Sequence, residues 1–205
     1  MTDTPSKTKV SSKIIYQNPW ITIHEDQTIS QDGNTGIYGY MESRDSCMVV
    51  VVDDQERLYL VRGFRYPSQS FGWELPGGGG DNEDLLEASK RELEEETGIT
   101  PPGHLEQLRT YGPIGRDPRG PILSVAYLLL APSFSPARAG GDAAGALWHP
   151  VNTLLTPASP LAFDHARILA DGIERARSKI EYSPLATSFC GPEFTITQLR
   201  TTYEA

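Results

Sequence analysis

The first hydrophobic pattern along the chain has a period of two, which predicts β-strands. In the segment WITIH, which begins at Trp20, alternate residues would share one face of a strand. The segments SKIIYQ and IYGYMES on either side have a similar character, and a QDGNTG stretch favours a turn. We therefore expect an antiparallel strand unit over residues 12–45. Residues 1–11 are polar, so we expect them to be disordered.

Longer apolar runs over residues 46–160 predict the strands of a larger domain. The segment CMVVVVD, which begins at Cys47, is apolar on both faces and is expected to be buried. The other strand candidates are RLYLVRGF (57–64), LEQLRTYGPIG (105–115), LSVAYLLLA (123–131) and LWHPV (147–151).

A C-terminal extension over residues 161–205 is expected to be helical. Apolar residues recur at helical spacing from 161 to 182. His165, within this helix, is expected to be a packed or surface histidine. A final helix should begin near Thr195, because Thr195 and Gln198 have the spacing of a capping box.

Four consecutive glycines follow Pro76 and predict a loop, since glycine is unfavourable inside helices and strands. From Asp84 to Thr97 the chain has neither glycine nor proline, which predicts a helix, and Gly98 is suited to end it. The centre of the chain is therefore expected to be a glycine loop followed by a helix.

This central helix is strongly acidic. Helical spacing pairs Arg91 with Glu95, whereas Glu92 and Glu96 have no cation one helical turn away. A solvated acidic face with ion pairs between successive turns therefore accounts for only part of the set. Carboxylates that converge without a counter-charge predict a bound divalent cation, and oxygen ligands favour Mg²⁺ or Mn²⁺.

The same segment resembles the signature of the Nudix hydrolase family. Gly77 is followed after five residues by Glu83 and, after seven more, by RELEEETGI, which begins at Arg91. The resemblance implies an α+β fold, a Nudix α/β/α sandwich with a mixed β-sheet, here flanked by the N-terminal strand unit and the C-terminal helical extension. Residues 46–160 would form its catalytic core.

The resemblance also implies roles for the residues of the signature. The metal ligands would be Glu92, Glu95, Glu96 and the carbonyl of Gly77. The residues implied to take part in catalysis are Glu95, Glu96, Arg91 and Glu83. Glu83 would orient the other carboxylates. Arg91 lies four residues before Glu95, and this helical spacing suggests that Arg91 orients Glu95.

Other segments look like the ADP-ribose pyrophosphatase branch of the family. There an aromatic residue at the position of Trp20 stacks on adenine across a homodimer that exchanges its N-terminal strands; Trp20 as a core residue is the alternative. The motif VRGFRYP…WELPGG implies that Arg65 contacts the substrate, and Arg62 and Arg116 are further candidates for substrate binding. Otherwise these arginines are surface charges.

One departure from the family pattern bears on catalysis. Where many members place a further glutamate shortly before a tryptophan-containing strand, this chain has Gly145, and Asp142 is the nearby carboxylate. The resemblance therefore implies two readings. The first is a Mg²⁺-dependent pyrophosphohydrolase that cleaves a nucleoside diphosphate linked to another group, with ADP-ribose giving AMP and ribose 5-phosphate. The second is an ADP-ribose sensor with weak or no hydrolysis.

The sensor reading draws on the second half of the chain, which resembles Nudix-related transcriptional regulators of NAD metabolism. In those proteins a segment like FTITQLRTTYEA opens a DNA-binding module. Because the sequence stops at Ala205, we expect no complete module here, and a net charge of −9 argues against binding to nucleic acid or anionic membranes.

Compartment and partners follow from composition. Two distant cysteines, Cys47 and Cys190, fit reduced thiols, and the N-terminus has no apolar signal segment. We therefore expect a cytoplasmic protein, and the family resemblance implies that it binds a nucleoside diphosphate and forms a homodimer through residues 12–45.

Overall fold

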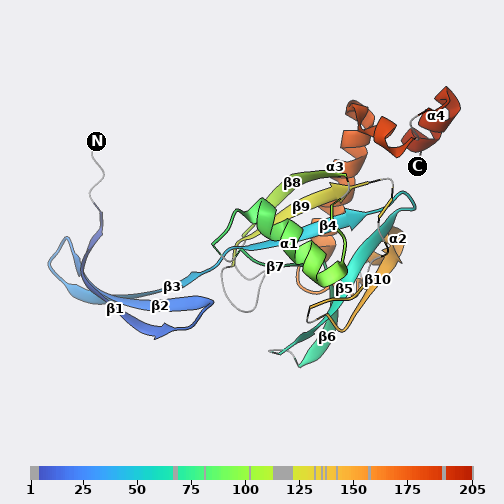
Figure 1. The fold of residues 1–205 in the computed structure, drawn as a ribbon. Coiled ribbons are helices and arrows are strands. Elements are labelled where there is room, and N and C mark those ends of the chain that lie inside the picture. The colour runs from blue at the N-terminus through green and yellow to red at the C-terminus, as the bar shows by residue number, and fades with distance from the viewer. Residues whose placement is uncertain are drawn as a thin grey trace. The chain divides into compact units, whose positions relative to one another are not determined.

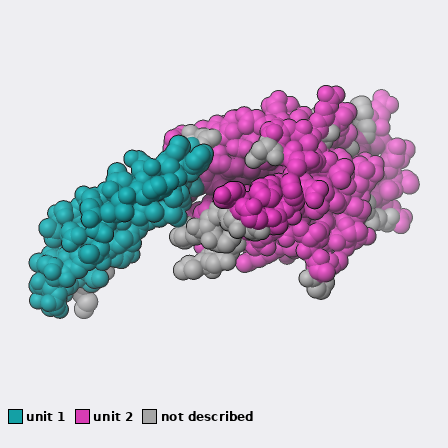
Figure 2. Space-filling view, turned by 90° about the horizontal axis from the view of Figure 1, so that it is seen from below, with its two compact units in different colours: residues 1–44 teal, residues 45–205 magenta. Residues whose placement is uncertain are grey.

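The computed structural model describes residues 5–204 except 67–68, 81, 102, 113–121, 132, 135, 137, 142, 157 and 191–192. The chain divides into two compact units, residues 1–44 and residues 45–205 (Figure 2). Within the described parts of the chain, no helix combines the length and the apolar character that crossing a bilayer requires.

The N-terminal unit is a three-stranded antiparallel sheet in the order β1-β2-β3. Its strands are β1 (Lys7–Gln17), β2 (Ile21–Ser30) and β3 (Thr35–Ser43). The turn between β2 and β3 uses Gly33 at φ +85°, a conformation that glycine adopts without steric cost. The expected disorder of residues 7–11 is wrong, because this polar segment lies in β1 and pairs with β2.

The larger unit contains a seven-stranded sheet in which β10-β5-β4-β9-β8 form the main order, while β6 pairs with β5 and β7 with β4. The strands are β4 (Ser46–Val52), β5 (Arg57–Arg65), β6 (Ser70–Glu74), β7 (Gly77–Gly79), β8 (His104–Tyr111), β9 (Ser124–Leu130) and β10 (Gly145–Pro150). The pairing of β4 with β9 is parallel and the other pairings are antiparallel, so the sheet is mixed.

Two long helices cover opposite faces of this sheet, α1 (Leu85–Thr97) and α3 (His165–Tyr182) (Figure 1). Alternate residues of β4 divide between them: Val49 belongs to the apolar cluster of Leu93 on α1, and Val50 to that of Leu169 on α3. The predicted α/β/α sandwich is confirmed. Three shorter helices, α2 (Val151–Leu154), η1 (Pro184–Phe189) and α4 (Ile196–Glu204), complete the unit.

The expectation of an irregular glycine loop after Pro76 is wrong. Gly77 to Gly79 form strand β7, and Gly77 pairs with Met48 on the buried strand β4. A Cβ atom on Gly77 would lie 2.2 Å from the Cys47 carbonyl oxygen, so a larger residue has no room there. The glycines therefore serve close strand approach, and pairing with β4 overrides their low strand propensity.

The C-terminal end follows its local sequence signals. Thr195 and Gln198 form the two reciprocal hydrogen bonds of a capping box. The Gln198 N–H donates to the Thr195 hydroxyl at 3.2 Å, and the Thr195 N–H donates to the Gln198 side-chain oxygen at 2.7 Å. Helix α4 therefore begins at the predicted position.

Candidate active site

Helix α1 starts and ends where its sequence predicts. Asp84 is the N-cap, and its carboxylate accepts hydrogen bonds from the N–H groups of Leu86 and Glu87 at 2.9 and 3.3 Å. Gly98 ends the helix with φ +68°. Because Leu93 is fully buried in the sheet's core, the orientation of the helix about its axis is fixed.

Arg91 joins the carboxylates on one flank of this helix. Its guanidinium donates to Glu83 at 2.8 Å, to Glu92 at 3.0 Å and to Glu95 at 3.2 Å. A fourth hydrogen bond, 3.3 Å long, reaches the Gly79 carbonyl on β7. The hydrogen bond with Glu83, followed by the charge of Glu92, raises the pKa of Arg91 above its usual value. Arg91 therefore orders the acidic flank and ties it to the glycine strand.

This network corrects one sequence expectation. Glu92 does have a cation, because its neighbour Arg91 reaches it. Counting residues three and four apart misses this pair, since adjacent helical side chains usually diverge. The predicted contact of Arg91 with Glu95 is present.

Strand β7 lies directly against two of the carboxylates. The Gly77 N–H donates to Glu96 at 2.9 Å. A Cβ atom on Gly78 would lie 2.4 Å from the carboxylate carbon of Glu92, so the absence of a side chain at Gly78 makes room for that carboxylate. The glycine strand therefore forms one wall of the acidic site.

Beneath the glycine strand, Cys47 is buried, and its thiol lies 3.8 Å from the Gly78 carbonyl oxygen. Burial raises the pKa of this thiol to about 11, and the negative charge of Glu92 acts in the same direction. The thiol is therefore protonated at neutral pH, so the candidate metal-ligand atoms on this flank are oxygen atoms.

The donor set matches a hard divalent cation, because carboxylates and backbone carbonyls are the ligands that Mg²⁺ and Mn²⁺ prefer. Among the described residues, no three His, Cys, Asp or Glu side chains gather closely enough to hold an ion by themselves. In this arrangement Arg91 holds Glu92 and Glu95, and the Gly77 N–H binds Glu96.

A second charged arrangement lies at the junction of β5 and β6. Arg65 forms a two-point ion pair with Glu74, whose side chain is only 3% exposed. The Arg65 guanidinium carbon also lies 5.3 Å from the ring centroid of Phe163. Sequence reasoning singled out Arg65 but missed Glu74 and Phe163. The signal for Glu74 was an isolated acid in the otherwise apolar segment WELP.

The other candidate residues are more dispersed. Arg62 is exposed, and its guanidinium carbon lies 4.9 Å from the ring centroid of Phe71. Since residues three apart on a strand point to opposite faces, Arg62 and Arg65 do not face the same side of β5. Trp20 belongs to the N-terminal unit and is 68% exposed, so it is not a core residue.

Two candidates, Arg116 and Asp142, lie outside the described residues. Gly145, at the position where the family pattern suggests a glutamate, begins β10 and pairs with Arg62 on β5. An added Cβ atom at Gly145 would lie 3.9 Å from the nearest heavy atom, so a side chain fits there.

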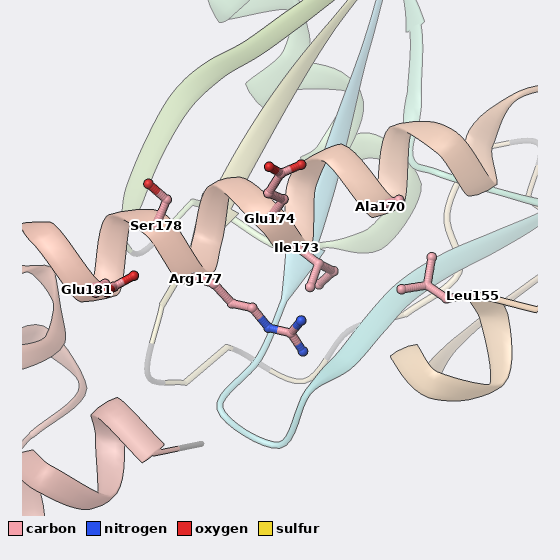
Figure 3. A pocket seen from close by; sticks show the side chains of 7 residues that line it. All are labelled: Leu155, Ala170, Ile173, Glu174, Arg177, Ser178 and Glu181. Atoms are coloured by element: carbon pink, nitrogen blue, oxygen red, sulfur yellow. The ribbon is translucent and has the colours of Figure 1, made fainter.

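A pocket of about 360 Å³ lies elsewhere, along the outer side of α3 (Figure 3). Leu155 faces it from the chain after α2, and charged side chains such as Arg177 and Glu181 line it from α3. Arg177 lies 3.8 Å from Glu56 in an exposed ion pair. The pocket lining includes none of the carboxylates of α1.

Comparison with known proteins identifies the family. The NUDIX domain model matches residues 42–172, and a model described as the nucleoside diphosphate sugar hydrolase N-terminal domain matches residues 8–41. An ADPR responsive transcriptional repressor NtrR of Acinetobacter baylyi is 32% identical over 163 residues, which cover 78% of this chain and 64% of the repressor. The chain thus spans less than two thirds of the repressor's length.

Two further relatives match parts of the chain. An ADP-ribose pyrophosphatase of Methanocaldococcus jannaschii is 32% identical over 122 residues, which cover 59% of this chain and 68% of that protein. The NUDIX domain of Shewanella oneidensis NrtR, solved in complex with ADP ribose, superposes with a TM-score of 0.57 at 30% identity and covers 66% of this chain and 90% of that domain. With the family model matching well over half of the residues, this chain belongs to the Nudix family.

Proposed function

We propose that the protein is a pyrophosphohydrolase that cleaves a nucleoside diphosphate linked to another group. The observation that carries this proposal is the flank of α1, where Arg91 forms hydrogen bonds with three carboxylates and with a carbonyl of the glycine strand. A diphosphate with its metal ion is a compact and highly charged ligand. The bare backbone of β7 would let such a ligand approach the carboxylates closely.

Nudix hydrolases generally use divalent metal ions, and we propose Mg²⁺, with Mn²⁺ as the alternative, for this site. Glu92, Glu95, Glu96 and the Gly77 carbonyl would hold it. When bound, the ion supplies neutralisation of the diphosphate charge and a lower pKa for a water ligand.

The protein's own residues would divide the remaining work. Glu83 fixes the Arg91 guanidinium, and Arg91 in turn orients Glu95. Glu96 is oriented by the Gly77 N–H, so its free rotation is restricted before substrate binds. Such prior ordering lowers the entropy that must be lost when the reacting groups come together.

ADP-ribose is the proposed substrate, with AMP and ribose 5-phosphate as products. The Methanocaldococcus jannaschii relative is an ADP-ribose pyrophosphatase, and the Shewanella oneidensis NUDIX domain was solved with ADP ribose. Arg65 would contact the phosphates and Trp20 would stack on the adenine, while Arg62, Arg116 and Asp142 are secondary candidates. We propose that the N-terminal unit forms a homodimer and that the protein acts in the cytoplasm.

A second candidate function is an ADP-ribose sensor with weak or no hydrolysis. Gly145 favours it, because no carboxylate stands at a position where a glutamate is common in the family. The repressor relative also matches 78% of this chain. The ordered acidic flank of α1 favours the enzyme, since a sensor has no need to align carboxylates for chemistry.

Release of AMP from ADP-ribose in the presence of Mg²⁺ separates the two functions. We expect turnover by the wild type and a large loss in Glu96→Gln. Glu94→Gln is the matched control, because Glu94 lies on the same helix and is exposed. Undiminished turnover in Glu96→Gln, or none in the wild type, would reject the enzymatic proposal, and tight ADP-ribose binding without turnover would favour the sensor.

Substrate range and assembly need separate measurements. A panel containing ADP-ribose, nucleotide sugars, dinucleoside polyphosphates and NADH should show the highest kcat/KM for ADP-ribose. Light scattering should give the mass of a dimer, and a monomer would exclude the proposed homodimer.

A further inference from the structure

Glu74 is a buried carboxylate whose negative charge must be compensated. It lies on β6, and Arg65 on the neighbouring strand β5 compensates it through two parallel contacts, from Nε and from Nη2. This fork geometry fixes the plane of a guanidinium as well as its position. Glu74 therefore determines where the Arg65 guanidinium lies.

A pair of glycines lies beneath this arrangement. Gly63 and Gly72 pair across β5 and β6, between the positions of Arg65 and Glu74. Cβ atoms added to these glycines would lie 3.7 and 3.8 Å from the Glu74 carboxylate. The carboxylate therefore lies over the bare backbone of the glycine pair, and Arg65 reaches across to it.

The Arg65 side chain remains 38% exposed although its partner is buried. It is also on the side of the sheet that carries α1: Tyr59, an even number of residues away on β5, belongs to the same apolar cluster as Leu93 of α1. The buried Glu74 carboxylate therefore orients the Arg65 guanidinium, which is accessible on the face of the sheet that bears α1 and its carboxylates.

Phe163 closes this arrangement from the side. Its φ of +52° is unusual for an aromatic residue, yet its ring is 37% exposed and lies beside Arg65 instead of in the core. The preceding residue, Ala162, donates its N–H to the Trp73 carbonyl at 3.0 Å, and Leu161 bridges to the same strand.

The segment is also fixed on its other side. His165 donates its N–H to the Ala162 carbonyl at 3.1 Å, and its buried Nδ1 accepts the Leu75 N–H at 3.1 Å. Phe163 therefore has a positive φ, contacts the ring of the buried His165 and is held in place by its neighbours, and such a residue is a reason to look for a functional role.

We propose that Glu74 and Phe163 are positioning residues, which hold the Arg65 guanidinium in the orientation that binds the anionic phosphates of the substrate. This inference rests on the proposed function, since it assigns two further residues to the same site. Glu74 fixes the plane of the guanidinium through the two contacts, and Phe163 restricts its movement through contact with the ring.

Steady-state kinetics with ADP-ribose and Mg²⁺ test the proposal. Glu74→Gln keeps the shape of the side chain but removes its charge, and we expect KM to rise about 10-fold or more with kcat changed less than about threefold. Phe163→Leu should raise KM several-fold, and Phe163→Tyr should restore it. In an Arg65→Lys background, which lacks the fork, Glu74→Gln should add little to the change in KM.

Glu106→Gln is the matched control, because Glu106 is a carboxylate of low exposure paired with Lys179 at 2.6 Å, on β8 and away from the Arg65 pair in the fold. It should leave KM unchanged. A merely structural role for Glu74 would lower Tm and the active fraction of the protein without moving KM, and that result would overturn the proposal. Should Glu74→Gln fail to fold, an unchanged KM in both Phe163→Leu and Arg65→Lys would overturn it.

Calorimetric binding of ADP-ribose distinguishes this inference from the proposed hydrolysis. If the wild type binds ADP-ribose without releasing AMP, the hydrolase proposal fails, while a 10-fold weaker Kd in Glu74→Gln still supports the positioning role. If the wild type hydrolyses ADP-ribose and KM is equal in all variants, the positioning role alone fails. A wild type that neither binds nor hydrolyses ADP-ribose overturns both.

Discussion

Replacing Gly78 with alanine should disable the site while leaving the fold intact. The new Cβ atom would lie 2.4 Å from the Glu92 carboxylate carbon, whereas ordinary contact begins near 3.4 Å. The carboxylate must therefore move by about 1 Å. Gly78 does not have a positive φ, so alanine suits the backbone there.

The size of the effect follows from that displacement. A misplacement of about 1 Å in a catalytic arrangement costs roughly 10²-fold in rate, equivalent to about 2.7 kcal/mol in transition-state free energy. The end of a glutamate side chain can rotate away, so we expect the free energy of unfolding to change by less than about 1 kcal/mol. Gly77→Ala differs, because its Cβ atom would meet the Cys47 carbonyl of β4 and disturb strand pairing.

Hydrolysis of ADP-ribose and urea unfolding, measured on the same preparations, check this prediction. Gly39→Ala is the control, since its Cβ atom would make an ordinary 3.8 Å contact in the N-terminal unit. A folded Gly78→Ala variant with activity within threefold of the wild type would refute the reasoning, because Glu92 would then not need its place against β7.

Three further predictions concern the core, pH and metal. Leu93→Ala should reduce the free energy of unfolding by about 2–5 kcal/mol in urea, whereas Leu147→Ala, at an exposed position, should cost less than about 1 kcal/mol. His149 contacts Trp73, and burial lowers the pKa of His149 below its usual 6.5. The folded state therefore favours the neutral imidazole, and protonation of His149 favours unfolding. Stability should therefore fall as the pH drops below 6.5, and Tm should fall less in His149→Gln. Saturation with Mg²⁺ at about 100 times Kd should stabilise the wild type by about 2.7 kcal/mol, raising Tm by roughly 5–10 °C, and Glu96→Gln should lose most of this rise.

Features set by local sequence could be predicted well. Asp84 and Gly98 bracket α1, and Thr195 with Gln198 opens α4, because capping depends on residues within one turn of the helix end. The family signature likewise lies within one continuous segment, so its spacing is readable without a structure.

Features set by contacts between distant segments could not be predicted. Strand β7 forms because its glycines pair with β4, although glycine alone predicts a loop. The ion pair of Arg65 with Glu74 depends on the register of β5 and β6, which no residue pattern in either strand specifies. Phe163 reaches Arg65 from a segment almost a hundred residues away along the chain.

The contacts of Arg91 also decide how the protein should respond to loss of metal. Carboxylates gathered around an empty site would repel one another and weaken the fold, but here a tethered cation already neutralises part of their charge. A chelator should therefore abolish activity while leaving circular dichroism at 25 °C unchanged. Because Arg91 is a counter-ion built into the helix, we expect loss of the metal to narrow the stability margin without unfolding the chain at 25 °C.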